Sequence, residues 1–356
     1  MQYFAETQVL KINPDTPSAE IIRKAAKALR SGKLVVFPTE TVYGLGANAL
    51  DRTAIDRIYS AKQRPAGDPV IAHIHDVGQM ETLTIKTPAT AYKLAESFWP
   101  GPLTLVLCRA PGVPANIATG RETIAIRMPS HPVARALLSE ADIPIAAPSA
   151  NTFTRPSATT AAHVLQDLDG RVDIILDGGS TTIGLESTVL DLTGERPVVL
   201  RPGGLIMEDL LSIAPDVILS PGYVKKDAHE SSPGQMLKHY SPRAEVMLFS
   251  GTIESMLQVI KEKSNELISS GRKIALLIAD EDRPIIEQAL ADAVIVISLG
   301  SDADMETIGH NLFAGLRDLD EQGVDVILTR DFGREGIGAA LWDRLLRAAE
   351  GKIIEA

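Results

Sequence analysis

The sequence is poor in the residue types that build disulfides, thiol metal sites and membrane spans. Cys108 is the only cysteine among 356 residues, which excludes an internal disulfide and a zinc site built from several cysteines. Because it ends the apolar run 105–108, we expect a buried strand residue rather than a nucleophile. No apolar run is long enough to cross a bilayer, and the first residues lack the basic and apolar regions of a secretion signal. We therefore expect a cytoplasmic protein without membrane contact.

The common nucleotide and metal motifs are also missing. No segment matches the phosphate-binding P-loop, and the Gly-x-Gly pairs at 44–46 and 336–338 lack the rest of a dinucleotide fingerprint. Structural turn glycines explain both pairs better. On a strand, His73 and His75 would point to opposite faces, which is the wrong geometry for chelating one metal ion. We therefore expect no metal held by protein ligands, although His73 can still contact a substrate at a strand end.

The composition is that of an ordinary globular protein, with 45% hydrophobic and 23% charged residues. Its length suggests about two domains. The formal net charge of −11 is uneven, because residues 1–204 are balanced and most of the acidic excess follows residue 243. The last third is thus a poor candidate for nucleic-acid binding, whereas the first part can still gather its cations on one face.

Helical and strand patterns alternate along the first 204 residues. The first helix follows Ser18, a possible capping residue, and Gly32 is well placed to end it. We expect helices at 18–30, 52–62, 90–98 and 132–140. We expect strands at 34–37, 69–74, 103–107, 123–127, 143–147, 172–176, 187–192 and 198–201. This mixture predicts one α/β domain with a mixed sheet.

The remainder of the chain has two parts. Residues 205–243 show a weaker pattern rich in turn residues, and we interpret them as a linker. Beyond them, strands at 273–278, 293–297 and 324–329 alternate with helices at 285–291, 305–319 and 337–349. That alternation predicts a smaller, parallel α/β domain.

Residues 38–48 (PTETVYGLGAN) are unusually polar for their place, since they directly follow the apolar run 34–37. A loop at the end of a buried strand is the usual place for a binding site in an open α/β sheet. Lys62 and Arg64 follow one helix later. Taken alone, cations at a helix end are more often a solvated surface feature favoured by the helix dipole than a phosphate site. Their position close in sequence to 38–48 makes the phosphate site a stronger alternative.

A second polar turn follows the strand at 143–147. Its Ser149 and Asn151 present a hydroxyl, an amide and backbone N–H groups in one concave turn, which suits an anion. An ordinary turn, in which both side chains bond only their own backbone, is an equally good interpretation. Further polar groups follow at strand ends, including Ser157, residues 186–188 and Arg201.

Taken together, several segments resemble the YrdC-like domain of threonylcarbamoyl-AMP synthases. They are 37–48, 62–65, 127–129, 147–151, 186–188 and 200–203. The match runs in order through about residues 11–204. The tail is similar to that of the longer members of the family, with a linker motif at 232–242 (SPGQMLKHYSP). The resemblance implies a YrdC-like mixed twisted sheet with helices at 11–204, a linker and active-site lid at 205–243, and a Rossmann-like domain at 244–356.

The resemblance implies the activity of an L-threonylcarbamoyladenylate synthase. Such an enzyme condenses L-threonine, bicarbonate or CO2, and ATP into threonylcarbamoyl-AMP and pyrophosphate, with Mg²⁺ on the ATP phosphates. The product supplies the threonylcarbamoyl group for the adenosine beside the tRNA anticodon. The implied partner is the tRNA threonylcarbamoyl transferase that accepts this product, and any direct binding of tRNA is expected to be weak.

Carried over position by position, the resemblance also implies roles for individual residues. The catalytic pair would be Lys62 and Arg64. The ATP side would be formed by Lys62, Arg64, Ala66, Ala118, Ser149, Asn151, Ser157, Arg201, His239 and Tyr240. The threonine side would be formed by Thr39, His73, Arg127, Ser187 and the backbone of Ala147. Arg127 would pair with the threonine carboxylate, and His239 and Tyr240 would fold over the site.

The chain departs from the family pattern at a few positions. Ala118 stands where a hydroxyl residue is often found, although Thr119 is adjacent to it. Met236 and Leu237 stand where many members have Lys and Tyr. These departures put one nucleotide contact and one lid contact in doubt.

Two other functions remain open from the sequence. A non-catalytic RNA-binding module would use clustered Lys and Arg on a concave α/β surface, and the neutral first domain and acidic second domain argue mildly against it. A carbamoyl transferase step in metal-centre maturation would use a related domain. The acylphosphatase and zinc-finger segments that accompany such domains are missing here.

Overall fold

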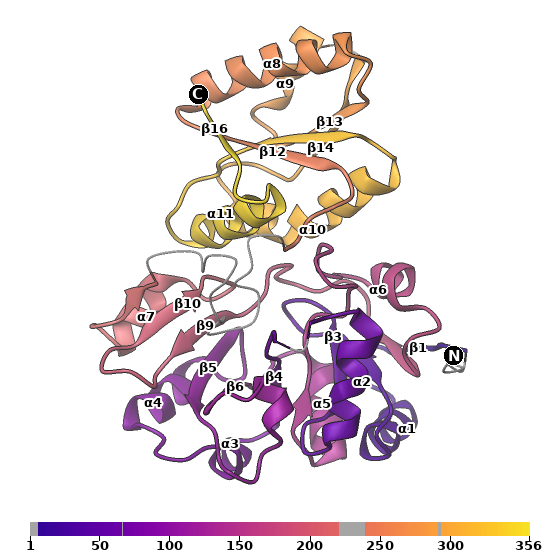
Figure 1. Cartoon of the computed structure of the whole chain (residues 1–356), viewed down its shortest axis with the longest axis vertical. Coiled ribbons are helices and arrows are strands. Elements are labelled where there is room, and N and C mark those ends of the chain that lie inside the picture. Colours follow the sequence, from indigo (N-terminus) through magenta and orange to yellow (C-terminus); the bar gives the residue numbers. More distant parts are fainter. Residues whose placement is uncertain (1–5, 66, 221–238, 291–292) are drawn as a thin grey trace. The chain divides into compact units, whose positions relative to one another are not determined.

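The computed structural model describes residues 6–65, 67–220, 239–290 and 293–356. It divides the chain into two compact units (Figure 1). The first unit is Met1–Phe153 with Ser157–Gln235, and the second is Thr154–Pro156 with Met236–Ala356. Both units are α/β, which confirms the predicted fold class. The domain limits stated from the sequence stay a prediction.

The first unit is built on a mixed sheet. In spatial order its described strands are β1 (Gln8–Lys11), β8 (Ile174–Asp177), β2 (Val35–Phe37), β3 (Gly44–Asn48), β7 (Ile145–Ala146), β4 (Ile71–His73), β6 (Thr123–Arg127), β5 (Leu103–Cys108), β9 (Thr188–Asp191), β10 (Val198–Arg201) and β11 (Ile218–Leu219). Pairs such as β2–β8 and β4–β6 are parallel, whereas β2–β3 and β5–β6 are antiparallel. Parallel neighbours end at the same edge, so β2 and β8 share one edge, while β4 and β6 run in the opposite direction.

Helices cover both faces of this sheet. They are α1 (Ala19–Arg30), α2 (Arg52–Lys62), α3 (Val77–Leu83), α4 (Ala89–Phe98), the 3₁₀ turn η1 (Ala115–Ala118), α5 (Pro132–Ala141), α6 (Ala161–Leu168) and α7 (Met207–Ile213). Apolar residues of α1 and α5 form one core with β2 and β8. The other helices contribute to a larger core that contains alternate residues of the same strands. This division follows from the two-residue repeat of a strand, which sends neighbouring side chains to opposite faces.

Helix α1 forms where the apolar spacing predicts it. Ile22, Ala25 and Leu29 are buried on one side of the helix. Ser18 is its N-cap in extended conformation, as predicted, although its side chain makes no capping hydrogen bond. Gly32, which follows the helix, has φ of 77°, a conformation that glycine adopts at little cost.

The predicted loop at 38–48 contains a strand, β3, which pairs antiparallel with β2. The prediction of an uninterrupted loop is therefore wrong. The strand was not predicted because the segment contains glycines, and glycine is a poor strand former. At Gly46 a side chain has no room: a Cβ there would lie 2.8 Å from Phe37 Cε1 and 2.9 Å from the Val35 carbonyl oxygen. Gly46 thus permits the tight approach of β3 to β2.

The predicted linker begins with ordered structure of the first unit. Helix α7 and strand β11 lie in it, and β11 extends the sheet by pairing in parallel with β10. Residues 221–238, which hold most of the linker motif together with Met236 and Leu237, lie outside the described residues. The expected lid at 205–243 therefore stays a prediction.

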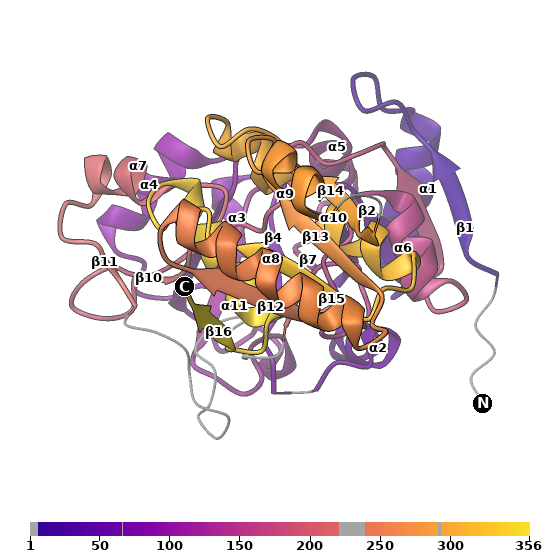
Figure 2. The same ribbon diagram turned by 90° about the horizontal axis from the view of Figure 1, so that it is seen from above.

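The second unit has a five-stranded sheet in which all described pairs are parallel. In spatial order the strands are β14 (Ile295–Ser298), β13 (Ile274–Ile278), β15 (Val326–Arg330), β12 (Glu245–Ser250) and β16 (Ile353–Glu355). The helices are α8 (Ile253–Ser269), α9 (Arg283–Leu290), α10 (Met305–Glu321) and α11 (Ile337–Ala348). Figures 1 and 2 show α8 and α9 on one face of this sheet and α10 and α11 on the other. The predicted parallel α/β fold is confirmed, while β12, β16 and α8 escaped prediction.

Among the described helices of both units, none combines the length and the apolar character that crossing a bilayer requires.

Candidate active site

Polar side chains of the first unit gather where β2, β4 and β6 end. The polar turn 38–43 follows β2, while His73 and Arg127 are the last residues of β4 and β6. The parallel register of β4 and β6 sets His73 directly opposite Arg127. Sequence alone placed all three at strand ends. Strands β4 and β6 run antiparallel to β2, and it is side-chain contacts that join the three: Arg127 bonds residues of the turn after β2, and the His73 ring meets that of Phe37.

Thr39 organises the turn after β2. Its hydroxyl donates to the Val42 carbonyl at 2.7 Å and accepts from the backbone N–H groups of Thr41 and Val42 at 3.2 and 3.3 Å. The Thr39 and Thr41 hydroxyl oxygens lie 2.8 Å apart. Because Thr39 already donates to Val42, Thr41 is the donor in this pair. The turn is thereby held rigid before any ligand binds.

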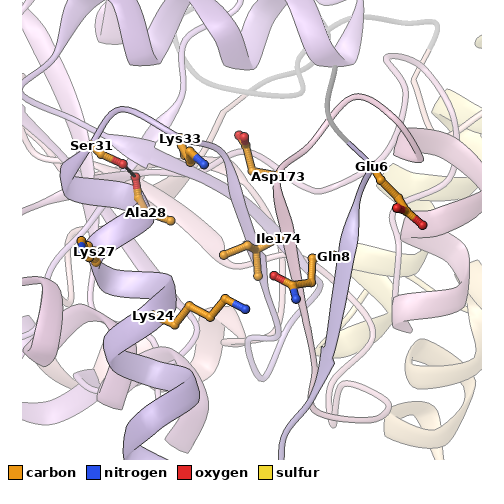
Figure 3. A pocket seen from close by; sticks show the side chains of 9 residues that line it. All are labelled: Glu6, Gln8, Lys24, Lys27, Ala28, Ser31, Lys33, Asp173 and Ile174. Carbon is orange, nitrogen blue, oxygen red and sulfur yellow. Dashed lines mark hydrogen bonds between the residues drawn. The ribbon is translucent and has the colours of Figure 1, made fainter. Parts of the chain in front are cut away.

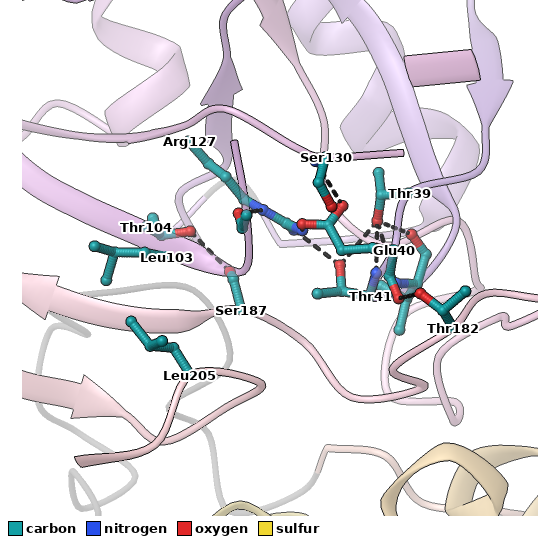
Figure 4. Close-up of polar contacts among 12 residues, drawn as sticks. Thr39, Glu40, Thr41, Leu103, Thr104, Arg127, Ser130, Thr182, Ser187 and Leu205 are labelled. Atoms are coloured by element: carbon teal, nitrogen blue, oxygen red, sulfur yellow. Dashed lines mark hydrogen bonds and ion pairs between the residues drawn. The ribbon is translucent and has the colours of Figure 1, made fainter. Parts of the chain in front are cut away.

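Arg127 and Glu40 form a buried ion pair in this cluster (Figure 4). Arg127 Nη2 donates to Glu40 Oε1 at 2.6 Å, and its Nη1 donates to Thr41 Oγ1 at 2.8 Å. Glu40 Oε2 accepts from the N–H of Ser130 at 3.1 Å. Both charged side chains are almost fully buried. Sequence reasoning did not give Glu40 a role, although it lies within the polar stretch. Its role depends on its partner Arg127, which lies 87 positions away and could not be paired with it from the sequence.

His73 lies beside this pair as an uncharged imidazole. Burial, followed by the positive charge of Arg127, lowers its pKa from 6.5 to about 3. Its Nδ1 is 3.3 Å from the Ile71 carbonyl oxygen, and its ring meets Phe37 edge to face. The backbone carbonyls of Ile71 and Ile145 both face the ring and orient it. His73 is therefore a fixed, neutral group rather than a source of charge.

Ser187 joins two predicted groups of residues. Its hydroxyl oxygen is 2.7 Å from that of Thr104, as Figure 4 shows. Arg201 Nη2 donates to the Ser187 carbonyl at 2.9 Å and approaches its hydroxyl at 3.3 Å. The structure thus brings Ser187, expected on the threonine side, into contact with Arg201, expected on the ATP side.

Lys62 is buried against the polar turn that contains Ser149 and Asn151. Its Nζ donates to the carbonyl oxygens of Ser149 and, at 2.6 Å, of Asn151. With 1% of its surface exposed, Lys62 is not a solvated helix end, so that alternative is wrong. The left-handed residue Gln63 ends α2 and lets the chain turn at this point. Two motifs that are 87 residues apart therefore form one structural element.

Arg64 is held on the other side of the α2 end. Its Nη2 lies 2.8 Å from the Pro69 carbonyl oxygen and 2.7 Å from Asp68 Oδ2, and its Nε donates to the Asp68 carbonyl at 3.2 Å. Arg64 is 7% exposed. Local backbone thus fixes the orientation of this guanidinium, as it does for Lys62.

The turn at 147–151 offers fewer backbone donors than the sequence suggested. The N–H of Ala147 bonds the Ile71 carbonyl at 2.8 Å, and the N–H of Ala150 bonds the Tyr43 carbonyl at 2.7 Å. These two N–H groups already donate to the sheet and to the loop after β2, so they are not available to an anion. The half-buried Ser149 hydroxyl remains suited to a ligand.

The remaining predicted residues lie in varied surroundings. Ser157 donates to the carboxylate of Glu186, and both side chains are buried. Ala118 belongs to the hydrophobic core, and the neighbouring Thr119 hydroxyl accepts from Arg121 Nη1 at 2.7 Å. Ala66 lies outside the described residues.

His239 and Tyr240 belong to the second unit. Their rings meet edge to face with centroids 4.1 Å apart, and Tyr240 packs against Phe313 at 5.2 Å and under the Arg344 guanidinium at 5.2 Å. In the same unit, Arg155 Nη1 pairs with Asp320 Oδ2 at 2.6 Å. These contacts describe the second unit alone, so the lid role of His239 and Tyr240 stays a prediction.

The described residues contain no group of three His, Cys, Asp or Glu side chains arranged to hold a metal ion. The buried cations and hydroxyls instead form an environment suited to an anionic ligand with a carboxylate.

Family models match both parts of the chain. The model for the Sua5, YciO and YrdC proteins, described as "Telomere recombination", matches residues 27–203. The model described as "Threonylcarbamoyl-AMP synthase, C-terminal domain" matches residues 206–350.

Similar proteins carry the same domains over nearly their whole length. The threonylcarbamoyl-AMP synthase of Pyrococcus abyssi is 44% identical over 94% of this chain and 95% of its own. That of Bacillus subtilis is 42% identical over 94% of each chain. The crystal structure of P. abyssi Sua5 complexed with L-threonine has a TM-score of 0.91 and 41% identity, and the match covers 99% of this chain and all of that one.

The mixed sheet with its strand-end site, together with the parallel second unit, defines a two-domain YrdC-like α/β enzyme of the nucleotidyltransferase type. The chain belongs to the threonylcarbamoyl-AMP synthase family, as its identity to the Pyrococcus and Bacillus proteins shows. The family resemblance stated from the sequence is confirmed.

Proposed function

We propose that the protein condenses L-threonine, bicarbonate or CO2, and ATP into threonylcarbamoyl-AMP and pyrophosphate. The observation that carries the proposal is the match over both domains to synthases of this name. The likeness to a Sua5 structure complexed with L-threonine supports the amino acid substrate. The product would supply the threonylcarbamoyl group for the adenosine beside the tRNA anticodon.

Threonine is assigned to the buried cluster of Thr39, His73, Arg127, Ser187 and the backbone of Ala147. Arg127 supplies positive charge for the threonine carboxylate, which shares the guanidinium with Glu40. The Ala147 N–H is already used by the Ile71 carbonyl, so its own carbonyl is the group that would accept from the threonine amine. The neutral His73 would contact threonine without competing for its carboxylate as a cation.

ATP is assigned to Lys62, Arg64, Ser149, Asn151, Ser157 and Arg201, with Ala66, Ala118, His239 and Tyr240 as further contacts. The carbonyl oxygens that hold Lys62 orient its ammonium group without removing its charge. A buried, oriented cation stabilises developing negative charge more strongly than one in water. Lys62 and Arg64 therefore carry the electrostatic part of catalysis in this proposal.

The chemistry requires no protein nucleophile. The threonine amine attacks the carbon of CO2 to give a carbamate, and a carbamate oxygen then attacks the α-phosphorus of ATP. The bond from that phosphorus to the bridging oxygen breaks, and pyrophosphate leaves with the electron pair. Holding the short-lived carbamate beside the α-phosphate is the main task of the site, because positioning converts an encounter in solution into a reaction between bound groups.

A magnesium ion would be held mainly by the phosphate oxygens of ATP and by water, as is usual for this cation. The described residues provide no carboxylate cage for it. Mg²⁺ would neutralise part of the triphosphate charge, and the residues above would orient the phosphates around it.

The wider setting follows from the product. A mixed anhydride of a carbamate and a phosphate is readily hydrolysed, so the product needs prompt transfer to a tRNA threonylcarbamoyl transferase. We place this handover in the cytoplasm, where the transferase can meet tRNA.

Pyrophosphate release tests the proposal. The purified protein should release pyrophosphate from ATP only when threonine and bicarbonate are both present. Serine, which lacks the threonine methyl group, is the matched control for the amino acid. Equal release without threonine would overturn the synthase function.

A further inference from the structure

A hollow rimmed by lysines lies on the first unit, between helix α1 and strand β1 (Figure 3). Its volume is about 320 Å³. Three lysines contribute to its lining, two from α1 and one from the turn before β2. The polar residues of the lining include Lys24, Lys27, Lys33, Gln8, Ser31 and Asp173.

The three lysines are available to a ligand. Lys24, Lys27 and Lys33 are exposed, and none of their ammonium groups has a hydrogen bond or ion pair with any residue that the structure describes. Figure 3 shows the Lys24 ammonium extending toward Gln8 and that of Lys33 lying beside Asp173. Unpaired ammonium groups around a hollow repel one another, and a bound anion relieves that repulsion.

The acidic side chain beside Lys33 in Figure 3 does not cancel this charge. Asp173 Oδ2 accepts from Arg57 Nη2 at 2.9 Å and from the Leu34 N–H at 2.8 Å. Arg57 also donates to the Gly32 carbonyl at 2.7 Å, so it is fixed in this pairing. Asp173 is thereby neutralised locally. Glu6 is the one other acidic residue of the lining, which leaves an excess of positive charge.

The positive charge extends beyond the hollow. Residues 21–39 contain no Asp or Glu but five basic residues, and all five side chains are exposed: Arg23, Lys24, Lys27, Arg30 and Lys33. On a helix, positions three and four apart lie on one face, so the α1 cations form a stripe that leads along the hollow. A stripe of this kind suits a chain of phosphates better than a single small anion.

The hollow is distinct from the candidate active site. Lys33 precedes β2 and Thr39 follows it, while Asp173 precedes β8 and Gly179 follows it. Gly179 belongs to the active-site end, since its carbonyl accepts from the Tyr43 hydroxyl at 2.6 Å. Because β2 and β8 are parallel, the two sites occupy opposite ends of the same strands, at least about 10 Å apart at 3.3 Å per residue.

We propose that this lysine hollow is a phosphate-binding site that holds the phosphodiester backbone of an RNA. Lysine binds phosphate as a point charge without demanding a fixed geometry, which suits sequence-independent contact with a backbone. A free polyphosphate shares this chemistry, and the experiment separates the two sources. The site does not depend on the proposed synthase activity.

The test compares two double charge reversals in the full-length protein. The site variant is Lys24→Glu with Lys27→Glu, and the matched control is Lys86→Glu with Lys93→Glu, two exposed lysines elsewhere on the first unit. Both change the net charge equally. Binding of a transcribed tRNA is followed by fluorescence anisotropy over a range of salt concentrations, and binding of inorganic tripolyphosphate by calorimetry. Circular dichroism checks that both variants remain folded.

The site variant should lose about tenfold or more in tRNA affinity near 50 mM salt, and its salt slope should fall by about two, one for each contact removed. The control variant should keep most of the tRNA affinity and most of the salt slope. Tripolyphosphate binding that depends on the lysines, without tRNA binding, would assign the hollow to free polyphosphate and overturn the RNA backbone. No binding of either probe, or equal losses in both variants, would overturn the site itself. Threonine-dependent pyrophosphate release should be unchanged in the site variant, which keeps this test separate from that of the proposed function.

Discussion

The two ends of strands β2 and β8 hold positive charge in opposite ways. At the carboxyl end, Arg127 and Lys62 are buried and oriented by a carboxylate, a hydroxyl and backbone carbonyls. At the amino end, Lys24 and Lys27 are exposed, and their ammonium groups have no partner among the described residues. Buried and oriented groups act through geometry, whereas exposed and mobile ones act through the field they produce. The difference predicts which end tolerates substitution and which responds to salt.

Replacement of Lys62 should give the largest effect. Lys62→Gln keeps a donor of similar length but removes the charge from the ATP side, so we expect pyrophosphate release to fall by about 100-fold or more. Removing the ammonium group from two carbonyl acceptors should also lower the free energy of unfolding by about 1–3 kcal/mol. Steady-state kinetics and urea denaturation measure the two quantities.

The control for Lys62 is Lys93→Gln, an exposed lysine of α4, which should leave both quantities nearly unchanged. If Lys62→Gln retained full activity, Lys62 would be a structural residue, and the carboxyl end would not differ in function from the amino end.

Replacement of Glu40 should give the next largest effect, because it orients Arg127. Glu40→Gln preserves the shape of the side chain but replaces a charged hydrogen bond by a neutral one. The KM for threonine should then rise about tenfold, as expected for the loss of roughly 1.4 kcal/mol of binding, while the KM for ATP should change much less. Glu81→Gln, an exposed carboxylate of α3, is the matched control. A parallel rise in both KM values would indicate a general loss of structure.

The pH dependence of stability provides a third test of burial at the carboxyl end. The His73 pKa is lowered to about 3 in the folded protein, so between pH 6.5 and 3 the unfolded chain binds the proton and the folded one does not. Stability due to His73 is therefore fully present above pH 6.5 and decreases as the pH falls, by up to about 1.4 kcal/mol per pH unit.

Urea denaturation of His73→Gln should show a shallower loss of unfolding free energy over that interval than the native protein shows. His75→Gln, at the partly exposed neighbouring histidine, should retain the native slope. Identical slopes for native protein and His73→Gln would mean that His73 is accessible to protons in the fold.

The sequence was informative where local pattern decides the structure. Helix α1 and the parallel second unit followed from apolar spacing, and the polar stretch at 38–48 marked the site because it follows a buried strand. Strand β3 was not predictable in this way, because Gly46 is required by the proximity of Phe37 and Val35 and has little strand propensity of its own. Its identity as a strand is imposed by tertiary packing.

Pairings between distant residues escaped prediction for a related reason. Glu40 and Arg127 meet through tertiary folding, although β3, β7 and β4 lie between β2 and β6 in the sheet. Arg155 and Asp320, 165 residues apart, pair within the second unit, although Arg155 directly follows the polar turn of the first domain in sequence. Such contacts depend on topology, which apolar periodicity does not specify.

Salt should produce the smallest effect at the carboxyl end and a large one at the amino end. Raising the salt from about 50 to about 500 mM shortens the Debye length to a few ångströms, which weakens contacts between exposed charges but hardly affects a buried ion pair. The KM for threonine should therefore change less than about twofold, since Arg127 is shielded from solvent. Phosphate binding at Lys24 and Lys27 should be lost over the same range. A threonine KM that rises as steeply as the phosphate affinity falls would mean that Arg127 is open to solvent ions when threonine binds, and the contrast between the two ends would no longer hold.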